Sequence, residues 1–167
     1  MALTTRIAVN TLLNQTGSND LGSPKFDVDV DNILNMASGT SSGQADLAFA
    51  DQRTLSASAT EDIDLAGTLI DGLGNTLTFV KVKAILIKAA TGNTNNVEVT
   101  PAAANGFVGP FADVSDQIDI APNGIMLVTA PNDGWAVTAG TGDLLTITNS
   151  AGGTSVTYDI IIVGTSA

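Results

Sequence analysis

The sequence predicts an all-β fold, an antiparallel β-sandwich of jelly-roll type with an extended N-terminal arm. Three observations predict it. Short apolar or alternating segments recur in the second half of the chain, separated by turn signals at intervals of about ten residues. Residues 76–90 are rich in β-branched side chains, which favour a pleated strand. No segment shows the period of an amphipathic helix, and this combination is typical of a sandwich, a jelly roll or a barrel.

The stretch 76–90, TLTFVKVKAILIKAA, predicts one long central strand. Turn residues lie on both sides of it, Gly74-Asn75 before and Gly92-Asn93 after. At a period of two, one face is apolar through its centre: Val80, Val82, Ala84 and Leu86. The opposite face is apolar at both ends and carries two lysines in its middle: Leu77, Phe79, Lys81, Lys83, Ile85 and Ile87.

Shorter strands are expected after residue 90, separated by turns rich in Gly, Pro and Asn: 97–100, 118–121, 125–130, 135–138, 144–148 and 155–163. In the last of them, apolar and aromatic side chains share one face: Val156, Tyr158, Ile160 and Ile162. Ile161 and Val163 make the end of this strand apolar on both faces. Such a strand lies in the centre of a sheet or is covered by another subunit.

The start of the chain differs from the rest, so the sequence predicts two regions: an N-terminal arm with peripheral strands at 1–60 and the sandwich domain at 61–167. Apolar side chains alternate with aspartates at 26–31 (FDVDVD), which predicts a half-buried strand. The segment 38–43 (SGTSSG) is of low complexity and predicts a flexible connector. Because large apolar residues are few before residue 60, this region is expected to lie outside the core.

The composition excludes several classes of function. The chain has no cysteine and no histidine, which removes Ser-His-Asp and Cys-His catalysis, an imidazole base and an ordinary zinc site. We therefore expect no enzymatic activity and no cofactor. The net charge is −11, and all six basic residues lie in the first 88 positions. Because phosphate binding needs clustered Lys and Arg, nucleic acid and an anionic membrane are not expected as partners.

The segment 39–43 (GTSSG) matches the G-x-S-x-G pattern of a nucleophile elbow. That motif requires a strand, a sharp turn and a helix around the serine, together with a histidine base. The chain has no histidine and shows no helix signal here. We interpret the segment as a linker.

Asp27, Asp29 and Asp31 have the spacing that opens a calcium-binding loop. Asn32 and Ser38 stand where such a loop needs a glycine and a glutamate. The valines between the aspartates favour a strand whose carboxylates face solvent, and no metal site is predicted.

Other carboxylates are candidates for a glycosidase pair: Asp62, Asp64, Asp113, Asp116 and Asp119. The sequence does not place any two of them together. Sugar clefts also use aromatic platforms, and the few aromatic residues of this chain fit core filling better.

Lys81 and Lys83 lie on one face of an otherwise apolar strand. Two lysines in this arrangement repel each other unless acids or water surround them. Two interpretations remain open: a solvent-facing patch, or a contact with acids of a neighbouring subunit or of a surface on which the protein docks.

Four segments resemble small structural proteins encoded by tailed bacteriophages: LGSP at 21–24, FADQRTL at 49–55, AGTGDLL at 139–145 and TYDI at 157–160. Those proteins are similar to the β-sandwich or jelly-roll capsid decoration (cement) proteins. The resemblance implies a homotrimer that binds the major capsid protein, often through an extended N-terminal arm. It also implies a place on the outer capsid surface of the virion, and in the host cytoplasm during assembly.

The leading hypothesis is a non-enzymatic virion protein that binds the outer capsid surface and stabilises the capsid lattice. Six residues are expected to contact a partner or another subunit: Lys25, Phe26, Lys81, Lys83, Ile161 and Val163. One alternative is a trimeric tail or fibre module that binds a receptor or glycan, which predicts an exposed aromatic platform. A second alternative is a carboxylate-based hydrolase, which predicts loss of activity on single Asp-to-Asn changes.

Overall fold

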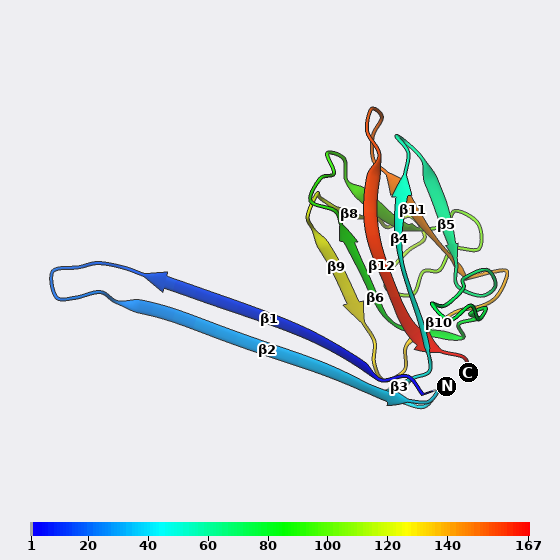
Figure 1. The fold of residues 1–167 in the computed structure, drawn as a ribbon, viewed down its shortest axis with the longest axis horizontal. Coiled ribbons are helices and arrows are strands. Elements are labelled where there is room, and N and C mark those ends of the chain that lie inside the picture. Colours follow the sequence, from blue (N-terminus) through cyan, green and yellow to red (C-terminus); the bar gives the residue numbers. More distant parts are fainter. Residues whose placement is uncertain (1) are drawn as a thin grey trace.

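The computed structural model describes residues 2–167, which form twelve β-strands and no helix. Two sheets pack face to face as a sandwich, and a long two-stranded hairpin projects from one end of it (Figure 1). The predicted all-β antiparallel sandwich is confirmed, whereas its jelly-roll type stays a prediction. None of the described residues belongs to a helix with the length and apolar character that a bilayer-spanning segment requires.

One sheet has five strands in the order β10–β6–β12–β4, and β9 also pairs with β6. The bounds are Leu47–Leu55 for β4, Lys81–Ala89 for β6, Ile125–Thr129 for β9, Trp135–Ala136 for β10 and Val156–Thr165 for β12. All of these pairings are antiparallel. β6 and β12 lie in the centre because each has a paired strand on both sides, as expected for a strand apolar on both faces.

The other sheet has four strands in the order β5–β11–β7–β8. The bounds are Thr60–Asp64 for β5, Val97–Pro101 for β7, Ile118–Ile120 for β8 and Leu144–Asn149 for β11. Alternate side chains of both sheets meet between them and are fully buried: Ile63, Val99, Leu145, Ile147, Ile85, Ile87, Tyr158, Ile160 and Ile162. This interior is the hydrophobic core of the sandwich.

The projecting hairpin consists of β1 (Thr5–Thr16) and β2 (Lys25–Ser38). Their antiparallel register runs without interruption from the pair Thr5–Met36 to the pair Thr16–Lys25. At about 3.4 Å per residue, twelve paired residues give a ribbon about 40 Å long. The two-residue strand β3 (Gln44–Ala45) pairs in parallel with the last two residues of β2.

The predicted central strand at 76–90 is shorter in the structure and starts at Lys81. The backbone before it turns away, because Leu77 donates to Leu69 and Phe79 donates to Leu65. A β-bulge then interrupts β6, since Val163 pairs with Ala84 while Gly164 pairs with Val82. Lys83 is the extra residue, and the alternation of faces changes there.

The bulge corrects the predicted faces of this strand. Val82 joins Ile85 and Ile87 in the core, although a strict period of two places it on the opposite face. Ala84 lies on the outer face of the sheet and contributes to a second, smaller cluster. Lys83 therefore does not share the core-facing side of Ile85, which the sequence could not show without the register.

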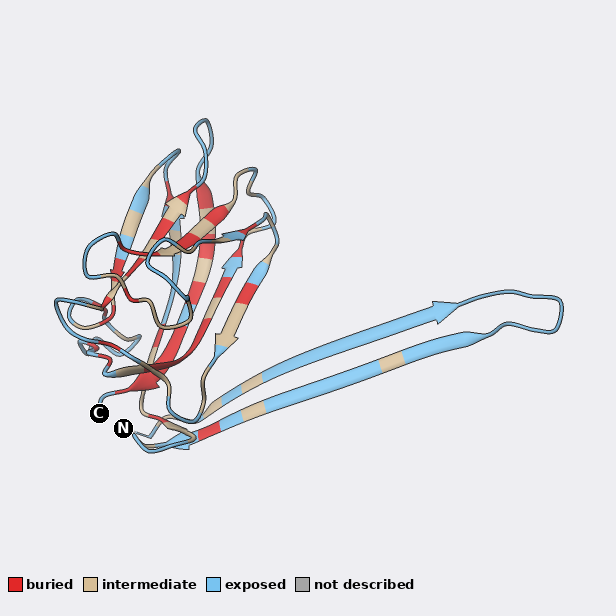
Figure 2. Ribbon diagram, turned by 180° about the vertical axis from the view of Figure 1, so that it is seen from behind, coloured by how far each residue is buried: buried red, intermediate tan, exposed pale blue. Residues whose placement is uncertain are grey.

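The strand predicted at 26–31 is present within β2, but its burial differs from the prediction. Phe26 and Val30 keep 59% and 55% of their surface exposed, so the strand is solvated on both faces rather than half-buried. Figure 2 shows this difference as a ribbon that is exposed over most of its length beside a sandwich with buried strands. The alternating segment is a strand, but none of the described residues covers its apolar side.

Candidate interaction surface

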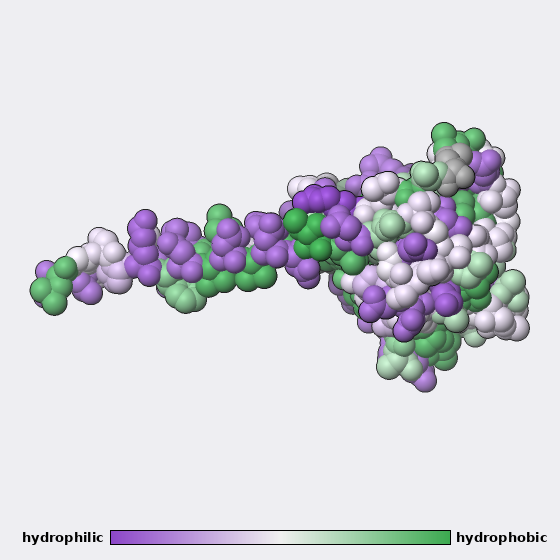
Figure 3. Space-filling view, turned by 90° about the horizontal axis from the view of Figure 1, so that it is seen from below, coloured by the Kyte–Doolittle hydropathy of each residue, from purple (hydrophilic) through white to green (hydrophobic). Residues whose placement is uncertain are grey.

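The hairpin is amphipathic because paired residues of antiparallel strands share a face. One face, here called the apolar face, carries mostly apolar side chains: Ile7, Val9, Leu13, Phe26, Val28, Val30, Leu34 and Met36. The other, the acidic face, carries mostly polar ones: Arg6, Asn10, Asn14, Lys25, Asp27, Asp29, Asp31 and Asn35, with Ala8, Leu12 and Ile33 between them. Figure 3 shows hydrophilic and hydrophobic residues on separate sides of the projecting ribbon.

The apolar face is exposed along most of its length. Its exposed large apolar residues come from both strands: Val9, Leu13, Phe26 and Val30. Leu12 and Ile33 are exposed on the acidic face. An isolated two-stranded ribbon is at best marginally stable in water, and contiguous exposed apolar surface usually marks a binding site. The hairpin is therefore the first candidate for contact with another molecule.

The acidic face has its own internal hydrogen bonds, and its aspartates form no ion pair with any residue that the structure describes. The amide of Asn10 donates to Asp29 over 3.1 Å, and the amide of Asn14 donates to Asp27. Within the described residues, ion pairs are formed only by Arg53, with Asp51 and Glu61 in the sandwich. The row of carboxylates on the hairpin is thus solvated and carries its negative charge uncompensated.

The base of the hairpin packs on the outer face of the five-stranded sheet. Met36, Ala45, Ala84 and Val163 form a buried cluster, and Leu3 and Ile7 pack against it. This contact shows that the apolar face of the hairpin and the outer face of the sheet are complementary. Beyond this base the hairpin diverges from the sandwich (Figure 1). Val9 is exposed there, whereas Leu86 and Leu127 of the sheet are half-buried.

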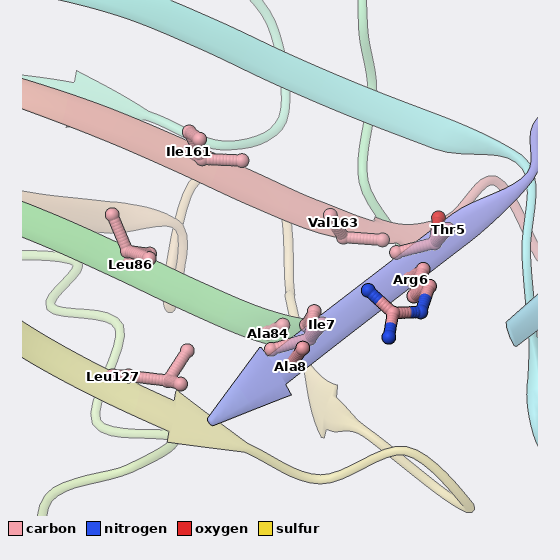
Figure 4. A pocket seen from close by; sticks show the side chains of 9 residues that line it. All are labelled: Thr5, Arg6, Ile7, Ala8, Ala84, Leu86, Leu127, Ile161 and Val163. Carbon is pink, nitrogen blue, oxygen red and sulfur yellow. The ribbon is translucent and has the colours of Figure 1, made fainter. Parts of the chain in front are cut away.

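The outer face of the sheet continues as an apolar row next to that contact. Four side chains lie side by side across four strands: Leu127, Leu86, Ile161 and Ala50. A groove with a volume of about 270 Å³ lies between this row and the start of β1. Figure 4 shows Ile7 beside Ala84, with Leu86, Leu127 and Ile161 farther along the same face.

Lys83 is buried and bonded within its own chain, which excludes for this residue both a solvent-facing patch and a docking contact. Its side chain is 1% exposed, and its ammonium donates to the carbonyls of Ser41 and Asn132 over 2.8 and 3.1 Å. Burial above all, together with Lys81, holds the pKa of Lys83 below its ordinary value, and Asp133 offsets part of this. Lys83 joins the connector after β2 to the sandwich and is neither solvent-facing nor available for docking.

The other predicted contact residues lie in three places. Lys25 and Phe26 lie at the distal end of the hairpin, on the acidic and apolar faces respectively. Lys81 is partly exposed at the start of β6. Ile161 is 41% exposed in the apolar row, whereas Val163 is buried beneath the base of the hairpin.

The structure thus brings Ile161 and Val163 onto one face but leaves Lys25 and Phe26 at the far end of the ribbon. Sequence reasoning missed Leu86 and Leu127, which lie beside Ile161. Alternation within each strand was a usable signal for them. The sequence did not show which strands pair, and the row is built from four separate strands.

The remaining sequence candidates occupy structural roles. Residues 39–43 form the connector after β2, and their Ser41 carbonyl accepts from Lys83. Asp116 accepts two backbone amides and Asp113 accepts from Ser115, so both stabilise their own loop. The hydrogen bonds from Ser115 lower the pKa of Asp113. Residues 2–167 contain no group of three carboxylates placed to hold a metal ion.

Comparison of the chain with protein-family models and with curated proteins finds no match.

Proposed function

We propose that this protein is a non-enzymatic structural protein of a virion, a decoration protein that binds the outer capsid surface and stabilises the capsid lattice. The observation that carries the proposal is the projecting hairpin, an amphipathic ribbon about 40 Å long with an exposed apolar face. Such a ribbon reaches beyond its own sandwich, as a bridge between neighbouring capsid subunits requires. The resemblance of four sequence segments to phage decoration proteins points the same way.

The hairpin changes the expected energetics of docking. A flexible arm loses conformational entropy when it binds. Here β1 and β2 are already paired with each other before docking. Most of this conformational entropy is therefore lost when the protein folds and not when it binds. Docking then depends mainly on burial of the apolar face, worth roughly 25 cal/mol per Å² of apolar surface removed from water.

Self-association, as a homotrimer, is part of the proposal and has a candidate surface. Ile160 and Ile162 are buried in the core of the sandwich, whereas Ile161 is exposed on the outer face of the sheet. Val163 lies on the same outer face but is covered by the base of the hairpin. Together with Leu86 and Leu127, Ile161 supplies the apolar row for a contact between copies. The proposed subunit contact is therefore the outer face of the five-stranded sheet.

The glycan-binding alternative requires an exposed aromatic platform. Among the described aromatic residues, Phe26 is the one that is exposed, and it lies on the apolar face of the hairpin. Trp135 and Phe111 pack against the core. No specific observation therefore favours a glycan-binding role over the structural one.

A shortened hairpin tests the docking role. Residues 9–32 are replaced by Asn-Gly, a two-residue turn that joins the paired residues Ala8 and Ile33. The contact of Ile7 and Met36 with the sheet is kept, so the sandwich is expected to fold normally. Co-sedimentation with bare capsids is expected to be lost, and unchanged binding by the shortened protein would refute the proposal.

A matched control replaces only the tip, residues 17–24, by the same Asn-Gly turn between the paired residues Thr16 and Lys25. This variant keeps both strands of the hairpin. It is expected to bind capsids like the unmodified protein, because the exposed apolar face is intact. Loss of binding by this control as well as by the shortened protein would assign binding to the tip and contradict a role for the strands.

A further inference from the structure

The three-stranded sheet of the hairpin has an incomplete third strand. β3 pairs with β2 only at Ala37 and Ser38. Along residues 25–36, β2 pairs with β1 on one side and has no neighbour among the described residues on the other. The outward N–H and C=O groups of this edge are therefore free to pair with another strand.

The side chains along this edge define what an added strand must carry. Phe26, Val28 and Val30 lie on the apolar face and alternate with the row of aspartates on the acidic face. Directly opposed residues of neighbouring strands lie about 5 Å apart, and opposite charges there attract. An added strand that alternates apolar side chains with lysine or arginine matches both faces at once.

The carboxylates are placed to receive such cations from the open side. The amides that contact Asp27 and Asp29 come from β1, on the paired side of β2. Asp31 makes no hydrogen bond to another side chain in the described part of the chain, although it is paired with Asn10 across the ribbon. No lysine or arginine of the described residues approaches these carboxylates within ion-pair distance.

A second copy of this chain does not supply the matching strand. Pairing of two β2 edges would oppose aspartate to aspartate, and like charges directly opposite are destabilising. No other strand of a second copy supplies a row of cations: the outer edge of β1 carries one basic residue, Arg6, and β6, which carries Lys81 and Lys88, is already paired on both sides. Arg53 is ion-paired and Lys83 is buried. The partner is accordingly a different protein.

We propose that the open edge of β2 along residues 25–36 binds an extended segment of another protein that alternates lysine or arginine with apolar residues. The added strand continues the third-strand position that β3 begins, and it widens the apolar face of the ribbon. The inference rests on the proposed docking role of the hairpin and names the chemistry of the segment that is bound.

Synthetic peptides of about twelve residues test the edge directly, since this is the length of the open strand. The probe alternates lysine with valine, and the comparison peptide alternates glutamate with valine. We expect the lysine peptide to bind in a fluorescence-anisotropy titration, more weakly at high salt, and the glutamate peptide not to bind. Absence of binding by the lysine peptide, or equal binding of both, overturns the proposal.

Hydrogen exchange locates the bound peptide. Protection is expected at backbone amides of residues 25–36, where the peptide closes the open edge. Protection confined to the outer edge of β1, or to the sandwich, overturns the proposal. A dimer of the protein held through the β2 edge, seen by light scattering without peptide, overturns it as well.

Charge variants separate pairing on this edge from attraction to the acidic protein as a whole. The triple variant D27N/D29N/D31N is expected to bind the lysine peptide about tenfold more weakly. The control D20N/E98Q/D119N removes the same charge away from the edge, and its affinity is expected to stay within about twofold. Equal weakening in both variants would show that binding depends only on the net charge of the protein, and it would overturn the proposal.

The peptide-binding tests and the capsid-binding tests can fail independently of each other. A protein that binds capsids but not the lysine peptide is still a decoration protein, and only the inference about β2 fails. A protein that binds the peptide along β2 but does not bind capsids keeps the edge site and loses the decoration role.

Discussion

The sandwich and the hairpin are built from the same kind of alternating strand, yet they end in opposite environments. In β11, every second side chain is buried against the facing sheet, as with Leu145 and Ile147. In β2, Val28 and Val30 alternate just as regularly, but no second layer covers them. The comparison teaches that alternation determines which side of a strand is apolar, whereas a second layer determines whether that side is buried.

The largest expected effect contrasts a core residue with a hairpin residue. Ile85→Ala removes a fully buried side chain from the core and should lower the free energy of unfolding by about 2–5 kcal/mol. Val30→Ala on the exposed hairpin should change it by less than about 0.5 kcal/mol. Urea unfolding measures the free energy of unfolding of both variants. Similar losses in the two variants would mean that the hairpin is covered in solution.

The next effect concerns the bulge that gives β6 its altered alternation. A Cβ on Gly164 would clash with the backbone carbonyl of Lys81, so Gly164→Ala should cost about 2–3 kcal/mol of stability. Gly92→Ala is the matched control, because a Cβ there meets open space. Thermal unfolding should separate the two variants by several degrees. Equal melting temperatures would argue against the tight pairing at the bulge.

A smaller effect is expected at the junction between the two regions. Lys83→Met leaves the carbonyls of Ser41 and Asn132 without their donor and should cost about 1–2 kcal/mol. Lys88→Met removes the same charge from an exposed position of the same strand and should be nearly neutral. NMR relaxation of the hairpin amides should show greater motion only in the first variant. Unchanged motion would show that Lys83 does not hold the connector.

The smallest expected effect is a decrease in the stability of the sandwich at alkaline pH, caused by Tyr158. Burial first, then the hydrogen bond to Glu61 over 2.6 Å, raises the pKa of Tyr158 above its ordinary value. Its contribution is therefore fully present below about pH 10 and decreases as pH rises further, because the unfolded chain ionises first. Tyr158→Phe should cost about 1 kcal/mol at neutral pH and flatten this alkaline decrease.

Denaturant unfolding of wild type and Tyr158→Phe at several pH values between neutral and alkaline measures the difference. Glu61 keeps its ion pair with Arg53 in the variant, so the neighbouring charges stay partnered. An alkaline decrease of the same size in both proteins would assign it to other groups.

Sequence reasoning identified the fold class and most strand positions because both depend on local patterns. The turn at Pro122-Asn123-Gly124 is a local signal of this kind, and Asn123 does adopt a left-handed conformation there. The core face of β12 was also readable, since Tyr158, Ile160 and Ile162 follow a period of two. These features need no knowledge of which strands are neighbours.

The candidate surface was only partly predictable for the same reason. Ile161 was singled out, but its neighbours Leu86 and Leu127 come from distant segments and required the register. Lys83 was expected to be accessible, and the bulge together with two loop carbonyls made it buried. The strand at 26–31 was expected to be half-buried, and no second layer among residues 2–167 covers Phe26 and Val30.

By itself the sequence determined an all-β chain, the apolar side of regularly alternating strands such as β12 and the absence of histidine and cysteine chemistry, because these follow from side-chain identity and local spacing. Only the tertiary structure decided that β1 and β2 pair with each other and project, that Lys83 is buried, that an apolar row is partly exposed, and that the β2 edge is open. Strand pairing and burial depend on contacts between residues far apart in the chain, and the energies of such contacts are not written in any single segment.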